Sequence, residues 1–299
     1  MPVAAVWNKC DNRCVMCTNG DEFSSGSSEQ YTLKKQIEKM ERYLRGDESV
    51  YYKGGDDPGF LALTGGEPTM HPDFFKLITY FRRRLPGVHI SLLSNGRRFA
   101  DAAFSEKYAS AAAPPFGTII PLHSSAAAEH DFISGASGSF GQTVAGLKNL
   151  FRLLGPEHGI EIRYIQHGVG KDRLKRTLGF LLNNFPDTAR YRVSVIHYEI
   201  EGQSAKNEKM LHLSLSESAA RLLDAADIMD KFSDLSIYHL PVCAVDERLR
   251  KRLKITLPPE ERVYPEDKCA GCAARRACLG LMDEYYRRFG DSELRTVKR

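Results

Sequence analysis

Short β-rich runs alternate with amphipathic helical stretches through most of this sequence. Between the β-rich runs, apolar residues recur at steps of three and four, as in Leu33, Ile37, Met40 and Leu44, which is typical of a helix that buries one face. Alternating strands and helices build parallel sheets, so the pattern predicts an α/β fold. The predicted strands are residues 3–7, 60–64, 88–93, 118–122, 160–165 and 191–197.

Length and charge exclude several classes of protein. At 299 residues the chain can bury a large core without disulfides. Its net charge of +4 is mild and does not predict a nucleic-acid partner. No window approaches the roughly 20 apolar residues that span a membrane. The apolar N-terminus is interrupted at Asn8 and Lys9, which argues against a signal peptide. We therefore expect a cytoplasmic protein with reduced thiols and no membrane partner.

The seven cysteines fall into two groups, separated by residues 18–242, which contain none. Cys10, Cys14 and Cys17 have the spacing C-x3-C-x2-C directly after the first predicted strand. Three thiolates can hold three irons of a four-iron cluster and leave the fourth open to an external ligand. Structural zinc sites prefer four protein ligands, and no nearby His or Cys completes such a set. The first group therefore favours a reactive iron–sulfur cluster, with zinc as the alternative.

This cysteine motif resembles that of the radical S-adenosylmethionine (SAM) enzymes, which have C-x3-C-x2-C in the loop after the first strand. The resemblance implies a partial (β/α)6 TIM barrel over residues 1–210. It also implies a [4Fe-4S] cluster whose open iron binds SAM. Reductive cleavage of SAM then releases a 5′-deoxyadenosyl radical, which abstracts a hydrogen atom from the substrate. In the family, the backbone at the position of Met16 contacts the adenine.

Further segments resemble SAM-binding motifs of the same family. Residues 64–69 read Thr-Gly-Gly-Glu-Pro-Thr after the second predicted strand; alone they fit an ordinary turn, but they are similar to the G-G-E-P motif that binds the SAM amino group. Residues 94–96, Ser-Asn-Gly, resemble a turn whose side chains reach SAM. In the region after the fourth strand, Ser134 stands where the family has an arginine that steadies the SAM carboxylate. We expect Arg163, on the fifth predicted strand, to take this role. The predicted SAM contacts are Met16, Gly65, Gly66, Glu67, Pro68, Ser94, Asn95, Ser124 and Arg163.

The sequence does not identify a catalytic residue. His123, His197, Tyr198 and Glu199 lie at the carboxyl ends of predicted strands, where barrel active sites gather, so they are candidates for catalysis or substrate contact. The adjacent pair at residues 130–131, His-Asp, precedes a glycine-rich helix start and is better explained as a pair that orders the loop.

The second cysteine group lies near the end of the chain. Cys269, Cys272 and Cys278 have the spacing C-x2-C-x5-C, and Cys243 lies 26 residues upstream of the first of them. Four thiolates suffice for a fully ligated four-iron cluster or a zinc ribbon, and their spacing does not decide the metal. Together with the first group, they resemble the Twitch domain, a shortened SPASM domain that binds one auxiliary [4Fe-4S] cluster in radical SAM enzymes. We predict a linking helix at residues 211–235 and a Twitch-like domain with the C-terminal tail at 236–299.

The C-terminal segments are similar to peptide maturases of the His-Xaa-Ser type, so modification of a ribosomally synthesised precursor peptide is our first prediction of function. The first strand begins at residue 3, which leaves no room for the N-terminal leader-binding domain of many peptide maturases. The alternatives are a radical SAM dehydrogenase of a small molecule, tRNA modification, and a non-catalytic zinc-binding scaffold with a degenerate site. The expected protein partner is an electron donor such as flavodoxin or ferredoxin.

Overall fold

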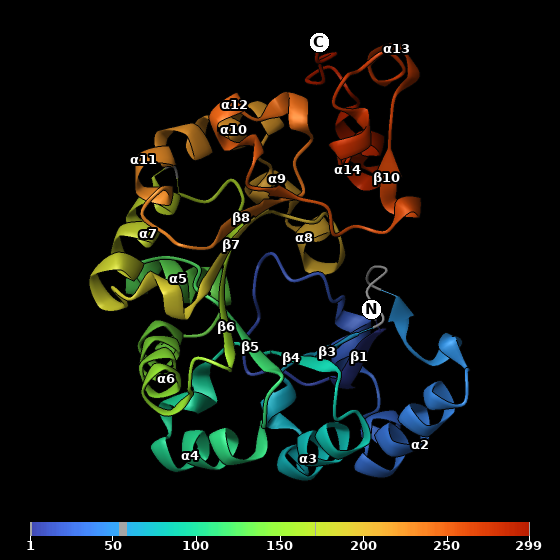
Figure 1. Ribbon diagram of the computed structural model, residues 1–299, viewed down its shortest axis with the longest axis vertical. Coiled ribbons are helices and arrows are strands. Elements are labelled where there is room, and N and C mark those ends of the chain that lie inside the picture. The colour runs from blue at the N-terminus through green and yellow to red at the C-terminus, as the bar shows by residue number, and fades with distance from the viewer. Residues whose placement is uncertain (1, 54–58, 171, 299) are drawn as a thin grey trace.

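A computed structural model describes the protein over residues 2–53, 59–170 and 172–298. The described strands include a nine-stranded curved sheet with the order β2-β1-β3-β4-β5-β6-β7-β8-β9 (Figure 1). All neighbouring strands in it are parallel except β1 and β2, which pair antiparallel. The strands are β1 (Pro2–Trp7), β2 (Tyr52–Lys53), β3 (Phe60–Gly65), β4 (His89–Leu93), β5 (Phe116–Pro121), β6 (Gly159–Gln166), β7 (Arg192–His197), β8 (Leu235–Tyr238) and β9 (Leu253–Lys254).

The six predicted strands correspond to β1 and β3 to β7, which confirms the α/β fold with a partial barrel. Two short parallel strands, β8 and β9, continue the sheet beyond them. The domain boundary that we predicted at residue 236 therefore falls inside β8, a strand of the barrel sheet. Its four residues, Leu-Ser-Ile-Tyr, are too few to reveal a period-two pattern in the sequence.

Helices connect the parallel strands and cover the outer face of the sheet, while the loop after β1 lies inside its curve (Figure 1). The longer helices are α2 (Leu33–Leu44), α3 (Phe74–Arg84), α4 (Ala102–Ala111), α6 (Ser139–Leu153), α7 (Arg173–Asn184) and α10 (Leu215–Asp224). The shorter ones are α1 (Asp21–Ser25), α5 (Ala127–Ser134), α8 (Gly202–Lys206), α9 (Glu208–Leu211), α11 (Ala226–Met229), α12 (Glu247–Arg250), α13 (Glu266–Cys269) and α14 (Asp283–Phe289).

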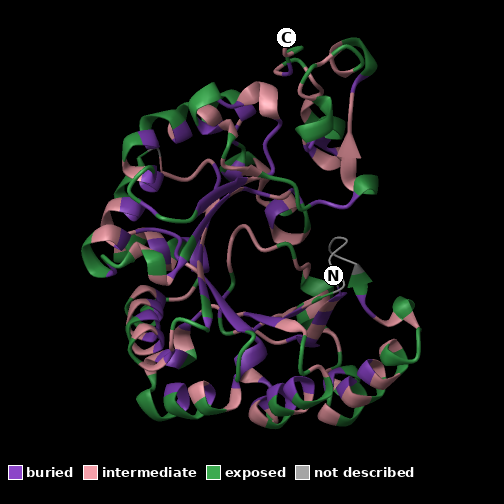
Figure 2. Cartoon of the chain, in the orientation of Figure 1, coloured by how far each residue is buried: buried purple, intermediate pink, exposed green. Residues whose placement is uncertain are grey.

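The sheet has one face packed on helices and one face on the lumen of the barrel. Along β6, buried residues alternate with partly exposed ones, because successive side chains of a strand point to opposite faces. The buried positions, such as Ile162, join the core with helix residues such as Leu178, and Figure 2 shows this buried layer between sheet and helices. The partly exposed positions include Glu161 and Arg163. The lumen is therefore partly polar and accessible, as a binding site requires.

The C-terminal region packs against the start of α10. It contains a second sheet, in which β10 (Arg262–Val263) pairs antiparallel with β11 (Leu281–Met282), and α14. The Tyr285 hydroxyl of α14 accepts the Leu215 N–H at 3.2 Å and donates to Glu293 Oε1 at 2.6 Å. Glu293 also accepts the Ser216 N–H at 2.8 Å, so its carboxylate joins the tail to the first turn of α10. None of the helices in the described parts of the chain combines the length and apolar character needed to cross a membrane.

Candidate active site

The loop that follows β1 contains Cys10, Cys14 and Cys17 and lies at the carboxyl edge of the sheet. Three segments that are distant in sequence hold this cysteine loop through main-chain hydrogen bonds. The bonds run from the Gly66 and Glu67 N–H groups to the Trp7 and Lys9 carbonyls (2.7 and 2.8 Å), from the Arg13 and Val15 N–H groups to the Ser134 and Ile133 carbonyls (2.8 and 2.9 Å), and from the Ser204 N–H to the Cys17 carbonyl (3.1 Å).

The glycine pair after β3 is needed by the cysteine loop itself. Gly65 has a φ of +129°, and a Cβ there would lie 2.2 Å from the Trp7 carbonyl oxygen. A Cβ on Gly66 would lie 2.4 Å from the Lys9 carbonyl oxygen. No side chain fits either position without moving backbone, so these glycines allow the loop to lie directly against the end of β3.

Burial and, to a smaller extent, negative charge on a neighbouring thiol raise the pKa of both Cys10 and Cys14. Burial is the main cause that raises the pKa of the Cys14 thiol, and negative charge on Cys17 and Cys10 adds to it. Burial also raises the pKa of Cys10 to about 12. Asn12 opposes this effect, since its N–H donates to Cys10 Sγ at 3.4 Å. Within residues 2–53, 59–170 and 172–298, no three His, Cys, Asp or Glu side chains are close enough to share a single metal ion.

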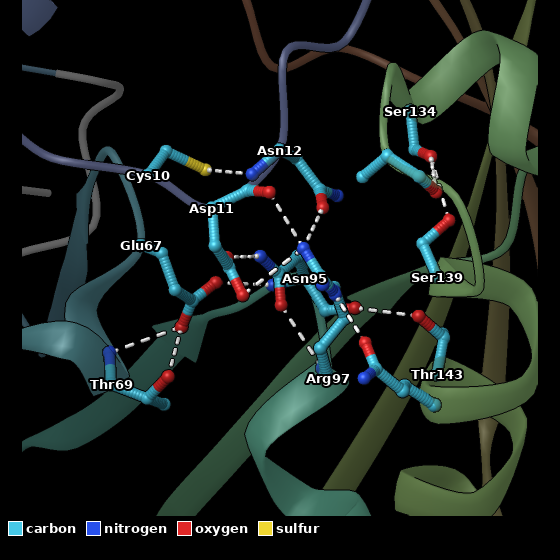
Figure 3. A network of polar contacts seen from close by, with 12 residues as sticks. Cys10, Asp11, Asn12, Glu67, Thr69, Asn95, Arg97, Ser134, Ser139 and Thr143 are labelled. Carbon is cyan, nitrogen blue, oxygen red and sulfur yellow. Dashed lines mark hydrogen bonds and ion pairs between the residues drawn. The ribbon is translucent and has the colours of Figure 1, made fainter.

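Glu67 is buried beside the cysteine loop, with 1% of its surface exposed. Its Oε1 accepts the Thr69 N–H at 3.0 Å and the Thr69 hydroxyl at 2.6 Å, and its Oε2 accepts the Asn95 N–H at 2.6 Å (Figure 3). Oε1 also accepts the Ser94 hydroxyl at 2.8 Å. Burial raises the pKa of Glu67 even though these hydrogen bonds favour the carboxylate. A carboxylate has about four acceptor positions, and four donors meet Glu67, three at Oε1 and one at Oε2.

Arg97 connects this region to the cysteine loop and was not singled out from the sequence. Its Nη1 donates to the Asp11 carbonyl at 2.6 Å and to Asn12 Oδ1 at 2.9 Å, and its Nε donates to Gln142 Oε1 at 2.6 Å. Asn95 contributes to the same network, because its Nδ2 donates to Asp11 Oδ1 at 2.6 Å (Figure 3). The sequence feature that could have identified Arg97 is its position directly after the Ser-Asn-Gly turn.

The other predicted SAM contacts are distributed around this centre. The Ser94 hydroxyl is used by Glu67, and the Ser124 hydroxyl donates to Glu129, so both have partners within the protein. Arg163 lies in the lumen and donates from Nε to Glu161 Oε1 at 2.6 Å. Met16 packs partly buried against the core, and Pro68 begins a single 3-10 turn, Pro68–Met70, that ends the glycine-rich segment.

Three of the four catalytic candidates, His123, His197 and Tyr198, are buried. His197 shares a hydrogen bond with Ser218 of α10 at 3.1 Å, and burial lowers its pKa to about 3. Tyr198 and His123 are each 1% exposed, and burial lowers the pKa of His123 well below its usual range. Glu199 differs, because its side chain keeps 37% of its surface exposed.

His239, which directly follows β8, contacts Glu199 and was missed because β8 itself was missed. Its Nδ1 lies 3.5 Å from Glu199 Oε1 and 3.3 Å from the His197 carbonyl. It has a φ of +65°, which is unusual for a residue with a side chain and cannot be inferred from sequence. Burial lowers the pKa of His239 to about 4, and burial raises that of Glu199.

The two edges of the sheet are also connected. The Tyr52 hydroxyl of β2, at one edge, donates at 2.5 Å to Oε1 of Glu261, which lies in the segment that follows β9 at the other edge.

The second cysteine group lines one cavity. Cys243, Cys269, Cys272 and Cys278 all contribute to it, although 26 residues separate the first two in the sequence. Main-chain N–H groups donate to two of the sulfurs. The bonds run from Val242 and Gly280 to Cys278 Sγ, both at 3.3 Å, and from Val297 to Cys272 Sγ at 3.4 Å.

A partly closed parallel sheet, with a C-x3-C-x2-C loop at its carboxyl edge and a buried Gly-Gly-Glu-Pro segment beside it, is the framework of a barrel enzyme whose three-cysteine loop suits an iron–sulfur cluster. Residues 5–181 match the family model described as the Radical SAM superfamily. This match covers more than half of the chain, so the chain belongs to the radical SAM superfamily. It is an enzyme of radical chemistry, in a family that uses a [4Fe-4S] cluster and SAM.

Curated relatives and solved structures agree with this assignment. Mycofactocin maturase MftC of Mycobacterium ulcerans (strain Agy99) is 28% identical over 178 residues, which is 57% of this chain and 42% of the relative. The chain thus spans less than half of that relative's length. Streptococcus suis SuiB bound to the precursor peptide SuiA has the same fold, with a TM-score of 0.57, 14% identity and coverage of 79% of this chain and 48% of that one. Native anSMEcpe with bound AdoMet and a Cp18Cys peptide has a TM-score of 0.60 at 13% identity, over 99% of this chain and 91% of that one.

Proposed function

We propose that this radical SAM enzyme modifies a ribosomally synthesised peptide. Support comes from the printed names of similar proteins: MftC is a maturase, and SuiB and anSMEcpe were both solved with peptides. The observation that weighs most within this chain is the cysteine loop, which three segments fix beside a lumen with polar residues. A cytoplasmic location, suited to a cluster that must be reduced by flavodoxin or ferredoxin, is part of the same proposal.

In this proposal Cys10, Cys14 and Cys17 bind three irons of a [4Fe-4S] cluster. Each thiolate of such a cluster binds a different iron, so the sulfurs need not approach one another as closely as the ligands of a single ion. The electrostatic effect of neighbouring thiols on Cys10 and Cys14 and the N–H donor of Asn12 fit this role. When bound, the cluster and SAM supply the 5′-deoxyadenosyl radical that abstracts hydrogen from the substrate.

SAM would be held mainly by the residues around Glu67. Glu67 Oε2 accepts one N–H where Oε1 accepts three donors, so Oε2 is the oxygen that suits the ammonium group of SAM. Asn95 belongs to the same network, and Gly65 and Gly66 remain predicted contacts. Ser94 is a positioning residue, because its hydroxyl acts through Glu67. Met16, Pro68, Ser124 and Arg163 remain predicted contacts.

The four C-terminal cysteines would bind an auxiliary [4Fe-4S] cluster in a Twitch-like domain, which follows the linking region at 211–235. The support for a four-ligand group is the single cavity that they line. The three N–H···S hydrogen bonds to Cys272 and Cys278 favour thiolates at that cavity.

Glu199 is the best remaining candidate for contact with substrate. Its side chain keeps 37% of its surface exposed, and burial raises its pKa, which favours a carboxyl group that exchanges a proton with a bound substrate. His239, held neutral by burial, lies at 3.5 Å and limits where that carboxylate can point.

The test uses anaerobically reconstituted protein with reductant, SAM and synthetic precursor peptides encoded by short genes next to its own. With a peptide deuterated at the reacting residue, we expect deuterium in 5′-deoxyadenosine and a mass change in the peptide. The Cys14→Ala variant is the control and should give neither. Deuterium transfer from a small-molecule alcohol, with none from any neighbouring peptide, would replace the peptide proposal by the dehydrogenase alternative.

A further inference from the structure

The cavity of the second cysteine group has two arginines in its lining. Arg275 and Arg295 border the same cavity as Cys243, Cys269, Cys272 and Cys278. No aspartate or glutamate belongs to the described lining of this cavity. At the first cysteine group, the negative charges of Glu67 and Asp11 act on Cys10. The nearby Arg97 is paired with Asp11 at 3.1 Å.

Arg275 is held in place by an aromatic ring that is itself fixed to the cysteine segment. Its guanidinium lies over the ring of Tyr264, 4.6 Å from the ring centre. The Tyr264 hydroxyl donates to the Cys278 carbonyl at 2.8 Å. A planar guanidinium that stacks on a ring loses mobility, so its charge stays at the wall of the cavity.

Arg295 belongs to a C-terminal segment, residues 294–297, that closes the cavity. The Val297 N–H donates to Cys272 Sγ at 3.4 Å, and the Val297 carbonyl accepts the Ala273 N–H at 2.9 Å. The Thr296 hydroxyl donates to the Lys268 carbonyl at 2.9 Å. These bonds at residues 296 and 297 hold the backbone next to Arg295 beside the cysteines, while the Arg295 side chain is itself exposed.

A four-iron cluster with four thiolates is negatively charged, and it gains a further negative charge when reduced. Nearby cations and N–H···S hydrogen bonds stabilise the reduced form more than the oxidised form and so raise the reduction potential. We infer that Arg275 and Arg295 raise the reduction potential of the auxiliary cluster and so make it the easier of the two clusters to reduce. This inference rests on the auxiliary cluster of the proposed function. Both arginines act by holding positive charge beside that cluster.

The experiment is a redox titration of the anaerobically reconstituted full-length enzyme, followed by electron paramagnetic resonance. The signal that SAM leaves unchanged belongs to the auxiliary cluster, since SAM binds only the cluster with an open iron. Arg275→Gln and Arg295→Gln are compared with Arg276→Gln, which removes an equal charge from the neighbouring residue outside the cavity lining.

We expect Arg275→Gln to lower the ratio of reduced to oxidised auxiliary cluster about tenfold at a fixed ambient potential, which is about 59 mV for one electron. Arg275→Lys should restore most of this loss, because it keeps the charge. The shift should shrink as salt is added, since exposed charges are screened. Arg276→Gln should change the potential much less.

Equal potentials for Arg275→Gln, Arg295→Gln and Arg276→Gln, at full iron content, would overturn the inference. Iron content separates this failure from failure of the proposed function. Two clusters contain about eight irons per chain. If the wild-type enzyme binds only about four, it has no auxiliary cluster, and the proposed auxiliary site fails together with this inference. If Arg275→Gln loses iron, Arg275→Lys and Arg295→Gln provide the comparison.

Discussion

Replacing Gly66 with alanine should displace the cysteine loop. A Cβ at this position would lie 2.4 Å from the Lys9 carbonyl oxygen, whereas ordinary contacts begin at 3.4 Å, so the two backbones must separate by 3.4 − 2.4 = 1.0 Å. That separation strains the hydrogen bonds from Gly66 to Trp7 and from Glu67 to Lys9. Overpacking costs about 1–3 kcal/mol and each of the two weakened hydrogen bonds about 1 kcal/mol, so we expect a loss of about 3–5 kcal/mol in the free energy of unfolding.

The assay is urea unfolding of the apo protein under reducing conditions, followed by fluorescence of Trp7. This residue is the only tryptophan of the chain, and its carbonyl accepts the Gly66 N–H, so its fluorescence reports on the affected contact. The matched control is Gly141→Ala, because Gly141 lies in α6 and a Cβ there meets no atom within 4 Å. That change should stabilise by up to about 1 kcal/mol, since alanine favours helix over glycine.

Iron content gives a second readout of the same substitution. Lys9 precedes Cys10, so a displaced loop should lose the first cluster while the C-terminal cysteines keep theirs. We expect Gly66→Ala to bind about four irons per chain after reconstitution, where the wild type binds about eight. If Gly66→Ala unfolds at the same urea concentration as Gly141→Ala and binds the full iron content, the contact between β3 and the cysteine loop is wrong.

Two further substitutions test Glu67 and the acid stability of the barrel. Glu67→Gln should lower the free energy of unfolding by about 2–3 kcal/mol, because the new amide nitrogen meets the N–H donors of Thr69 or Asn95. The same change should weaken SAM binding at least tenfold, measured by calorimetry. Unchanged affinity for SAM would show that Glu67 is not part of the SAM site. His158, which is 3% exposed and bonded to Thr118, has a pKa that burial lowers to about 4. Since the unfolded chain protonates it near pH 6.5, its stabilisation is complete above that pH and falls as the pH drops towards 4, by about 2 kcal/mol at pH 5. Unfolding at pH 7.5 and pH 5 should therefore show a smaller acid loss for His158→Phe than for the wild type, and an equal loss would mean that His158 is not held neutral.

The sequence predicted the parts of the fold whose signals are local. β1 and β3 to β7 are long enough to show strand patterns between helical stretches, and all six were found. β8 was missed because it has only four residues and lies next to the predicted domain boundary. Because β8 was not predicted, His239 was missed as well. The positive φ of His239 and its contact with Glu199 depend on where β7 and β8 end.

The candidate site divides in the same way. The cysteines and the Gly-Gly-Glu-Pro segment are short motifs, so spacing was enough to find them. The role of Arg97 depends on the approach of the cysteine loop to the turn after β4, and 86 residues separate it from Asp11. Similarly, the sequence suggested that Gly65 and Gly66 admit a ligand, while their closest contacts are with Trp7 and Lys9.

The most direct test of the central claim is iron and SAM chemistry measured on one anaerobic preparation. The account predicts about eight irons per chain as two four-iron clusters. It also predicts reductant-dependent release of 5′-deoxyadenosine from SAM, which Cys14→Ala abolishes and which Cys272→Ala retains at least in part without substrate. Stoichiometric zinc in place of iron, with no 5′-deoxyadenosine from reduced wild-type protein, would contradict it.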